Sequence, residues 1–432
     1  MSLNSQTLRS QEDAQKLSIG VLGDGQLAQM LSEAAEDLGL NLHVFASSSD
    51  SPAAQTSTQV TLGLLDNSSD FLNFCKDKDL LTIESEFIDP EQLKHAKTKV
   101  WPSPETLECL RDRLPQKKSL IENGIATSPL YPFSSFDDAR KTLKQKPQGL
   151  VFKKRLFGYD GYGTRVIKTP EDLNSFEQEL LALDHSCSPS SATPLQNTHS
   201  KTSEQNSEIN SQSQNTIRGS DAPSDSSLSI KEWIAEDFVP FTKELAVSFA
   251  RNPSGQILSF PLVESHQENS KCLWVKGPIA ESPYQSTLES LKSYVNKINF
   301  VGLISFELFL TQDGTLLVNE VAPRVHNSAH YSIEALNISQ FTAHLMAICN
   351  MELPQKPILQ QEGFAMYNLI GERDCPASAL TLPQALSPNI YLHWYKKTQS
   401  RKGRKLGHLT TLADTPEKAL LELEKIRAKF QL

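Results

Sequence analysis

The sequence has little that would mark a secreted, membrane-bound or nucleic-acid-coating protein. Residues 1–16 are polar and lack the apolar core of a signal peptide, and no apolar stretch approaches the ~20 residues of a membrane span. The six cysteines are scattered singly, without a CxxC pair, as is typical of reduced thiols in a cytosolic protein. A net charge of −9 excludes a generally basic surface but leaves room for a few local cations around an anionic substrate. We therefore expect a cytoplasmic protein that binds small molecules, with no nucleic acid and no membrane.

One internal region also lacks apolar residues. From about residue 185 to 229 the composition is dominated by Ser, Asn, Gln, Thr and Pro. Such a segment cannot bury enough surface to offset its ordering entropy, so we predict a disordered insertion. Strand-like patterns resume at Trp233, which places the insertion inside a domain rather than between two.

The first ~125 residues have the pattern of a small α/β unit. An apolar run over 17–22 predicts a strand, apolar spacings of three and four over 27–38 predict a helix, and 42–45 predicts a second strand. A later strand at 80–83 runs into Glu84, and a helix is expected over 105–123.

The glycine turn from Gly23 to Ala28 fits the GxGxxG/A fingerprint of a dinucleotide site. The fingerprint also needs an acidic residue after the second strand, where this chain has Phe45-Ala46-Ser47-Ser48-Ser49. Three interpretations stay open: bound NAD, a tight turn that needs small residues, and amides that bind a substrate phosphate at the helix N-terminus.

A second glycine-rich segment follows a basic strand end. Lys153-Lys154-Arg155 precedes Gly158-Tyr159-Asp160-Gly161-Tyr162-Gly163. Glycines let backbone amides curl around phosphate oxygens, and a lysine at the strand end meets them as a point charge. The alternative is a surface hairpin with a basic edge.

Two glutamates are expected side by side on a hairpin. Strands over 303–310 and 315–320 are joined by Gln312-Asp313-Gly314, so Glu307 and Glu320 fall close together. Adjacent carboxylates repel, and a divalent cation removes that cost. Mg²⁺ prefers one or two carboxylates plus nucleotide phosphates, which predicts a Mg²⁺ site. The alternative is two exposed strand glutamates that happen to align, although the flanking residues are strongly apolar.

Directly after this pair, the chain places Arg324, His326, Asn327 and Ser328 within five positions. These are the donors that a small planar anion such as bicarbonate would need. In isolation, His326 is more often a structural hydrogen-bonding residue than a catalytic group.

Five motifs together resemble one family. They run through 19–30, 112–117, 158–161, 319–328 and 403–408, in the order seen in 5-(carboxyamino)imidazole ribonucleotide synthetase. The resemblance covers about Leu17 to His408 apart from the insertion, and Asn-Glu-x-Ala-Pro-Arg-x-His-Asn-Ser is its most specific motif. It implies an α/β ATP-grasp fold with an N-terminal Rossmann-like domain (17–125), a split ATP-grasp domain (126–350) and a small β-rich C-terminal domain (351–432).

The resemblance implies that ATP phosphorylates bicarbonate and that the carboxyl group passes to the exocyclic amine of aminoimidazole ribonucleotide, in purine synthesis, by a homodimer. The implied catalytic residues are Arg324, His326 and Asn327, and the Mg²⁺ ligands are Glu307 and Glu320. The implied ATP-binding residues are Arg113, Lys153, Gly158, Tyr159, Asp160, Gly161, Tyr162, Gly163, Glu236, Asp237, Phe238, Val239, Glu244, His266, Asn319 and Glu320. The implied ribonucleotide-binding residues are Gly25, Gln26, Leu27, Glu84, Tyr159, Asp160, Lys396, Arg404 and Lys405.

Some positions depart from the family pattern. Tyr162 stands where the family usually has Arg or Lys, Ala28 replaces a glycine, Lys402 replaces a proline, and His266 falls about one position from the expected histidine. Other ATP-grasp ligases, such as a formate-dependent transformylase or a biotin carboxylase, share part of the Asn-Glu-x-Ala-Pro-Arg motif. A catalytically weakened scaffold and a nicotinamide-linked dehydrogenase are the remaining alternatives.

Overall fold

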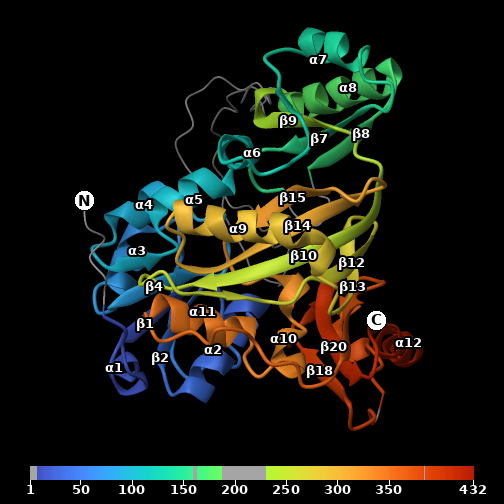
Figure 1. Cartoon of the computed structure of the whole chain (residues 1–432). Helices are drawn as coiled ribbons and strands as arrows, with labels where there is room; N and C mark the ends of the chain where they lie inside the picture. The colour runs from blue at the N-terminus through green and yellow to red at the C-terminus, as the bar shows by residue number, and fades with distance from the viewer. Residues whose placement is uncertain (1–6, 159–162, 187–229, 384) are drawn as a thin grey trace, which may run out of the picture.

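The structure is a computed structural model that describes residues 7–158, 163–186, 230–383 and 385–432. Most of its strands belong to three sheets, which Figure 1 shows as a blue unit, a green unit and a long central sheet that continues into the red C-terminal segment. The predicted insertion lies almost entirely outside the described residues and stays a prediction. Among the described helices, none is both long and apolar enough to cross a membrane.

The first sheet is parallel and has the order β3-β2-β1-β4-β5. Its strands are β1 (Ser18–Leu22), β2 (Asn41–Ala46), β3 (Val60–Leu62), β4 (Leu80–Ile83) and β5 (Lys99–Trp101), and its helices are α1 (Gln11–Gln15), α2 (Gln26–Leu38), α3 (Ser68–Cys75) and α4 (Pro90–His95). The predicted β-α-β opening is confirmed. The strand order reverses between β1 and β4, and ligands of open α/β sheets bind beyond the strand ends at such a point.

The single helix predicted over 105–123 is wrong. The structure has α5 (Pro104–Arg111) and α6 (Arg113–Glu122), separated at Asp112, whose backbone is extended (φ −97°, ψ 123°). Asp112 caps α6 by accepting a hydrogen bond from the Leu114 amide at 2.9 Å. The ring of Pro115 would clash with the carbonyl four residues earlier in a continuous helix. The break therefore has a local cause.

The second sheet is antiparallel and has the order β6-β9-β7-β8. Its strands are β6 (Leu130–Pro132), β7 (Leu150–Lys154), β8 (Thr164–Ile167) and β9 (Trp233–Asp237), and its helices are α7 (Phe136–Leu143) and α8 (Pro170–Ser186). Phe152 of β7, Phe176 of α8 and Trp233 of β9 form its aromatic core, with the last two ring centroids 4.9 Å apart.

The third sheet has the order β15-β14-β10-β12-β13-β16-β20-β18, with β11 also paired to β10. Its strands are β10 (Phe241–Arg251), β11 (Ile257–Ser259), β12 (Val263–Glu268), β13 (Lys271–Gly277), β14 (Gly302–Thr311), β15 (Leu316–Ala322), β16 (Gly363–Ile370), β18 (Ile390–Trp394) and β20 (Lys405–Ala413). A small separate pair is β17 (Cys375–Pro376) with β19 (Gln399–Ser400). Because β13 pairs directly with β16, hydrogen bonds cross the expected boundary at residue 350.

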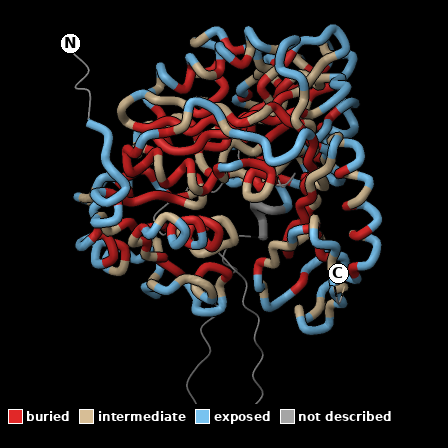
Figure 2. Tube along the Cα trace, turned by 60° about the horizontal axis from the view of Figure 1, so that its bottom comes forward, coloured by how far each residue is buried: buried red, intermediate tan, exposed pale blue. Residues whose placement is uncertain are grey.

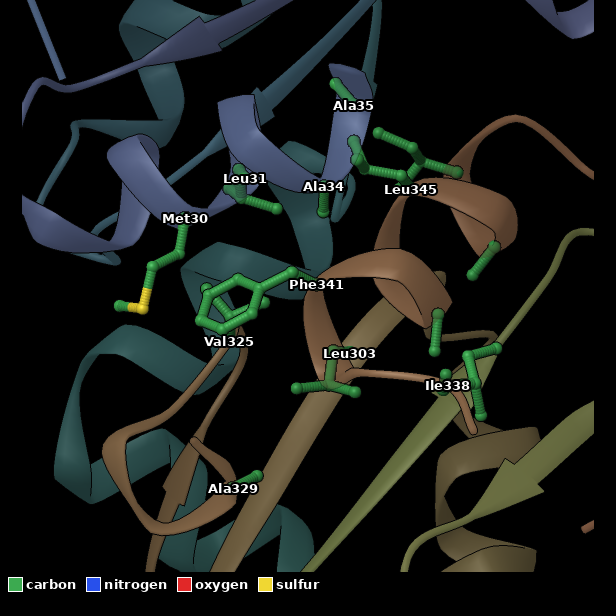
Figure 3. Packing of buried hydrophobic residues seen from close by; sticks show 14 of the residues in the cluster. Met30, Leu31, Ala34, Ala35, Leu303, Val325, Ala329, Ile338, Phe341 and Leu345 are labelled. Atoms are coloured by element: carbon green, nitrogen blue, oxygen red, sulfur yellow. The ribbon is translucent and has the colours of Figure 1, made fainter. Parts of the chain in front are cut away.

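Helices link the first and third sheets. The remaining helices are α9 (Gln285–Lys297), α10 (Ser332–Ala335), α11 (Gln340–Ile348) and α12 (Pro416–Arg427), and the single turn η3 covers Asn327–Ala329. In Figure 3, side chains of α2 (Met30, Leu31) face Phe341 of α11, and Val325 lies beside them. Val325 and Ala329 are at most 1% exposed, so the segment carrying the predicted catalytic residues is anchored in this core. In Figure 2 the buried residues, drawn in red, run through the interior of the molecule, and the exposed ones lie mainly around its outside.

Candidate active site

A cavity of about 1330 Å³ is lined by residues from all three sheets. Glu84 comes from the end of β4, Lys153 from β7, and Glu307 from β14. The segment from Arg401 to Lys405 closes another part of its wall. Motifs far apart in the sequence therefore meet around one space.

The two glutamates predicted on the hairpin are direct cross-strand partners. Glu307 of β14 pairs with Glu320 of β15, and the register shifts immediately afterwards, so that Asn319 forms a bulge. In a regular strand Asn319 and Glu320 would point to opposite faces. The bulge changes this alternation, and both residues line the cavity.

The electrostatics of this pair favour a bound cation. Burial, followed by the nearby charge of Glu320, raises the pKa of Glu307 to about 8. A divalent cation would remove both the repulsion and the need for a proton. No group of three or more His, Cys, Asp or Glu side chains suited to a metal occurs among the described residues. Two carboxylates with space for phosphates match the preference of Mg²⁺ rather than that of a metal held by protein alone.

Two cations lie next to the carboxylate pair. Arg113, the first residue of α6, has Nη1 3.0 Å from a Glu320 oxygen. Lys153 of β7 donates to Asn319 Oδ1 at 2.8 Å and to Glu236 Oε2 at 3.0 Å. Arg113 begins α6 directly after the break at Asp112. Asp112 is itself held by an ion pair with Arg155 at 2.6 Å.

Lys117 is a buried cation that our sequence interpretation did not assign to the site. Its side chain is fully buried and donates to Thr127 Oγ1 (2.6 Å), the Val318 carbonyl (2.9 Å) and Glu236 Oε2 (3.3 Å). Burial lowers the pKa of Lys117 to about 8 despite the neighbouring Glu236. It is the last residue of the motif at 112–117, which was the available signal.

The expected nucleotide strand β9 and its continuation line the cavity through Glu236, Asp237, Phe238 and Val239. The Glu236 carboxylate points into the lysine cluster, and Asp237 pairs with Lys146 at 2.8 Å. Lys168 Nζ lies 5.0 Å from the centre of the Phe238 ring. Both carboxylates are thus paired with protein cations.

Glu244 and His266 stand on the adjacent strands β10 and β12 and also line the cavity. Burial raises the pKa of Glu244 to about 7. The His266 ring is stacked on Trp274 with centroids 5.1 Å apart.

Glu84 contacts the glycine turn and bears on its three interpretations. Its two carboxylate oxygens accept hydrogen bonds from the Gly25 and Ala28 amides, both at 2.9 Å. A Cβ on Gly23 would lie 2.3 Å from Glu84 Cγ, and Gly23 has φ +119°. An internal carboxylate thus takes two of the amides at the N-terminus of α2, which favours the tight-turn interpretation over the dinucleotide and phosphate interpretations. Gln26 and Leu27 line the cavity, whereas Gly25 does not.

The segment after β15 is fixed by several polar contacts. Arg324 forms a buried ion pair with Glu86, another residue that our sequence interpretation did not assign. The Asn327 and Asn368 side-chain amides bind each other reciprocally at 2.9 and 2.7 Å.

His326 is a neutral imidazole. Nδ1 accepts from the Ser328 amide at 3.4 Å and lies 2.9 Å from the Ser328 hydroxyl, so the proton belongs on Nε2. Burial and then the charge of Arg324 lower the pKa of His326 to about 3. Nε2 lies 3.8 Å from Glu307.

In the C-terminal basic segment, Arg404 and Lys405 line the cavity as expected. Lys396 does not: it is exposed with φ +50°, and its neighbour Lys397 lines the wall instead. Of the second glycine segment, Gly158 lines the cavity, while Gly163 lies beside Lys154, which donates to its carbonyl at 2.7 Å. Tyr159, Asp160, Gly161 and Tyr162 lie outside the described residues.

Comparisons with known proteins agree with this architecture. Three family models match: the ribonucleotide synthetase preATP-grasp domain over residues 16–111, the ATP-grasp domain over 203–341, and the phosphoribosylaminoimidazole carboxylase C-terminal domain over 365–422. The N5-carboxyaminoimidazole ribonucleotide synthase of Synechococcus elongatus is 33% identical over 399 residues, which is 91% of this chain and 88% of that protein. The chain belongs to the N5-carboxyaminoimidazole ribonucleotide synthase family. The ATP-grasp fold implied by the resemblance is confirmed.

Solved structures of synthases from this family have the same fold. The synthase of Thermotoga maritima is 29% identical with a TM-score of 0.73, covering 96% of this chain and 99% of that one. The synthase of Aspergillus clavatus, solved with ADP and 5-aminoimidazole ribonucleotide, is 26% identical with a TM-score of 0.75, covering 95% and 98%.

Proposed function

We propose that the protein carboxylates the exocyclic amine of 5-aminoimidazole ribonucleotide in purine biosynthesis. It consumes ATP and bicarbonate and yields 5-(carboxyamino)imidazole ribonucleotide, ADP and phosphate, with carboxyphosphate as the activated intermediate. The observation that carries this proposal is the single cavity shared by Lys153, the Glu307–Glu320 pair, the segment after β15 and the C-terminal basic segment. The proposal is also supported by relatives in a family of ribonucleotide synthases, one of which was solved with ADP and this ribonucleotide.

We assign the nucleotide to the side of the cavity formed by β7, β9 and β10. The backbone of 236–239 meets the base, and Glu244 meets the ribose. Arg113 and Lys153 contact the phosphates, since each already lies within 3.0 Å of the carboxyl or amide groups around the metal site. Phosphoryl transfer needs mainly alignment and charge neutralisation from the protein, which these fixed cations supply.

Glu307 and Glu320 are the residues that would hold Mg²⁺, and their cross-strand pairing together with the raised pKa of Glu307 supports this assignment. When bound, the metal ion supplies neutralisation of charge on the phosphates. Arg113 contributes a permanent positive charge next to the Glu320 carboxylate.

The acceptor side is formed by Arg324, His326, Asn327 and Lys405. A neutral His326 with its proton on Nε2 acts as a hydrogen-bond donor to a carboxylate oxygen rather than as a second positive charge. Arg324, paired with Glu86, adds charge whose position is fixed. Arg404 and Lys405, with Lys397 in the place first given to Lys396, receive the ribonucleotide phosphate. Gln26, Leu27 and Glu84 complete the wall on the first sheet.

Steady-state release of ADP tests the proposal when each component is omitted in turn. We expect turnover only with ATP, Mg²⁺, bicarbonate and aminoimidazole ribonucleotide together, and none when formate replaces bicarbonate. Equal ADP release without the ribonucleotide would refute the coupled reaction, and turnover with formate would indicate a transformylase. The expected homodimer is tested separately by sedimentation velocity.

A further inference from the structure

His330 is a second histidine beside the reaction segment, and its hydrogen bonds determine where its proton lies. Gln340 of α11 accepts from the His326 amide through Oε1 and donates to the His326 carbonyl through Nε2, both at 2.8 Å. This reciprocal pair fixes which end of the Gln340 amide is oxygen. The same Nε2 lies 2.8 Å from His330 Nδ1. Because an amide nitrogen only donates, His330 Nδ1 must accept, and the imidazole proton must be on Nε2.

The protonated nitrogen of His330 has no acceptor within the part of the chain that the structure describes. Among the described residues, none forms a hydrogen bond with His330 Nε2, and this atom is not one of the enclosed polar atoms that lack a partner. The residue is only 1% exposed, yet it lines the active-site cavity. A donor on the cavity wall with no protein acceptor is available for a hydrogen bond to a molecule inside the cavity.

The ring cannot easily turn away. It packs against Phe341 and His408, with centroids 5.5 and 5.0 Å away. His408 in turn is stacked on His393 at 4.5 Å, and the His393 ring binds Glu334 at 2.5 Å. The donor is therefore held in place before any substrate arrives, as catalytic hydrogen-bond donors need to be.

The charges around His330 suit a bound anion. Its pKa lies well below the ordinary value, first because of burial and then because of His326, Lys405 and other neighbours, including Arg324. The groups whose charges act on it are thus two cations, Lys405 and Arg324, and two imidazoles, His326 and His393.

We propose that His330 contacts substrate, and that its Nε2–H donates a hydrogen bond to an oxygen of bicarbonate and of the carboxyl group formed from it. His330 and His326 then act as two neutral donors beside Lys405 and Arg324, which together bind a planar anion without adding further charge. This inference rests on the proposed function.

Two substitutions separate the two nitrogens of the ring. In His330→Asn, the side-chain amide occupies the Nδ1 position and can still meet Gln340, but no donor reaches the cavity. In His330→Gln, the amide nitrogen reaches the Nε2 position and restores the donor. Steady-state kinetics with bicarbonate varied in degassed buffer, at saturating ATP and ribonucleotide, give KM for each protein.

We expect His330→Asn to raise KM for bicarbonate by about 10- to 100-fold, the effect of losing one hydrogen bond to a charged group. KM for ATP should stay unchanged, and His330→Gln should recover most of the loss. An unchanged KM for bicarbonate in His330→Asn overturns the inference, as does an equal rise in KM for all three substrates or a rise for the ribonucleotide alone. If His330→Asn does not fold, a His330→Gln protein with a greatly raised KM for bicarbonate overturns it equally. Failure of the wild-type protein to require bicarbonate refutes the proposed function instead.

Discussion

At the scale of single residues, one carboxylate oxygen organises the part of the cavity to which we assign the ATP phosphates. Glu236 Oε2 accepts from Ser128, Lys117 and Lys153, and these contacts keep the pKa of Glu236 at about 2 in spite of its burial. Breaking a buried charged pair by removing one partner is costly because the other charge remains without compensation. Lys117 therefore acts through Glu236 and Lys153, as a positioning residue.

We predict that Lys117→Met lowers the free energy of unfolding by about 3 kcal/mol, because the buried ammonium loses four hydrogen bonds, one of them to its charge partner Glu236. Lys118→Met, at the exposed neighbouring position, should change it by less than about 0.5 kcal/mol. Urea unfolding of both variants measures the difference. Similar stabilities for the two variants would show that Lys117 does not support this cluster.

Site residues could be assigned from the sequence where they belong to a specific motif. They could not be assigned where their role depends on burial next to a distant partner. Glu307, Glu320 and Arg324 stand in a characteristic sequence pattern, and all three line the cavity. Glu86 looks like an ordinary surface residue in a sequence, and Lys117 is marked there only as the last position of the motif at 112–117. Their importance comes from long-range partners, Glu236 and Arg324, which a single sequence does not reveal.

At the scale of elements, two irregularities aim side chains into the cavity. The bulge at Asn319 turns neighbouring residues of β15 toward the same space. The break at Asp112 starts a new helix with Arg113. The strands and helices that we predicted followed from apolar periodicity. That periodicity does not encode a bulge, and it did not reveal the break, whose local causes are Pro115 and the Asp112 cap.

Glu320 of β15 and Lys405 of β20 lie on different elements, and we expect their substitution to change different kinetic constants. Glu320→Gln keeps the shape of the bulged strand but removes a charge from the metal pair, so kcat should fall by a factor on the order of 10². Lys405→Ala, at the start of β20, should mainly raise KM for the ribonucleotide, because a phosphate contact is equally strong in ground and transition states. The test is steady-state kinetics with each substrate varied. A rise in KM for ATP alone in Lys405→Ala would reverse our placement of the two substrates.

At the scale of the whole molecule, one buried histidine joins the first sheet to the third. His344 of α11 binds Thr82 of β4 through Nε2 at 2.8 Å, and its Nδ1 accepts from the Leu303 amide of β14 at 3.0 Å. Both nitrogens are in use in the neutral form, and burial lowers the pKa of His344 to about 4. Protonation would place a charge in the core and break one of these hydrogen bonds.

This junction predicts acid sensitivity with a defined sign. Below an unfolded-state pKa of about 6.5 the unfolded chain binds a proton that folded His344 does not, so stability falls as the pH drops from 6.5 toward 4. The contribution should be on the order of 2 to 3 kcal/mol across that window. Unfolding free energies between pH 4 and 7 should fall less steeply in His344→Asn than in the wild type, whereas the exposed control His95→Asn should retain the wild-type slope. Equal slopes for all three proteins would contradict this account.

The overall architecture was predictable only in part. The resemblance implied the ATP-grasp fold, and the parallel first sheet followed from its β-α-β pattern. The expected division at residue 350 remains a prediction, but the third sheet runs through it because β13 pairs with β16. Antiparallel pairing between strands so distant along the chain depends on tertiary packing, which local patterns do not encode.

The central claim is that phosphate leaves ATP by way of bicarbonate inside this cavity. The most direct test follows ¹⁸O from labelled bicarbonate into inorganic phosphate during turnover with ATP, Mg²⁺ and aminoimidazole ribonucleotide. Attack by a bicarbonate oxygen on the γ-phosphoryl group leaves that oxygen in the released phosphate when the carboxyl group is transferred. We predict labelled phosphate that appears in step with ADP. Phosphate carrying oxygen only from water would contradict the account.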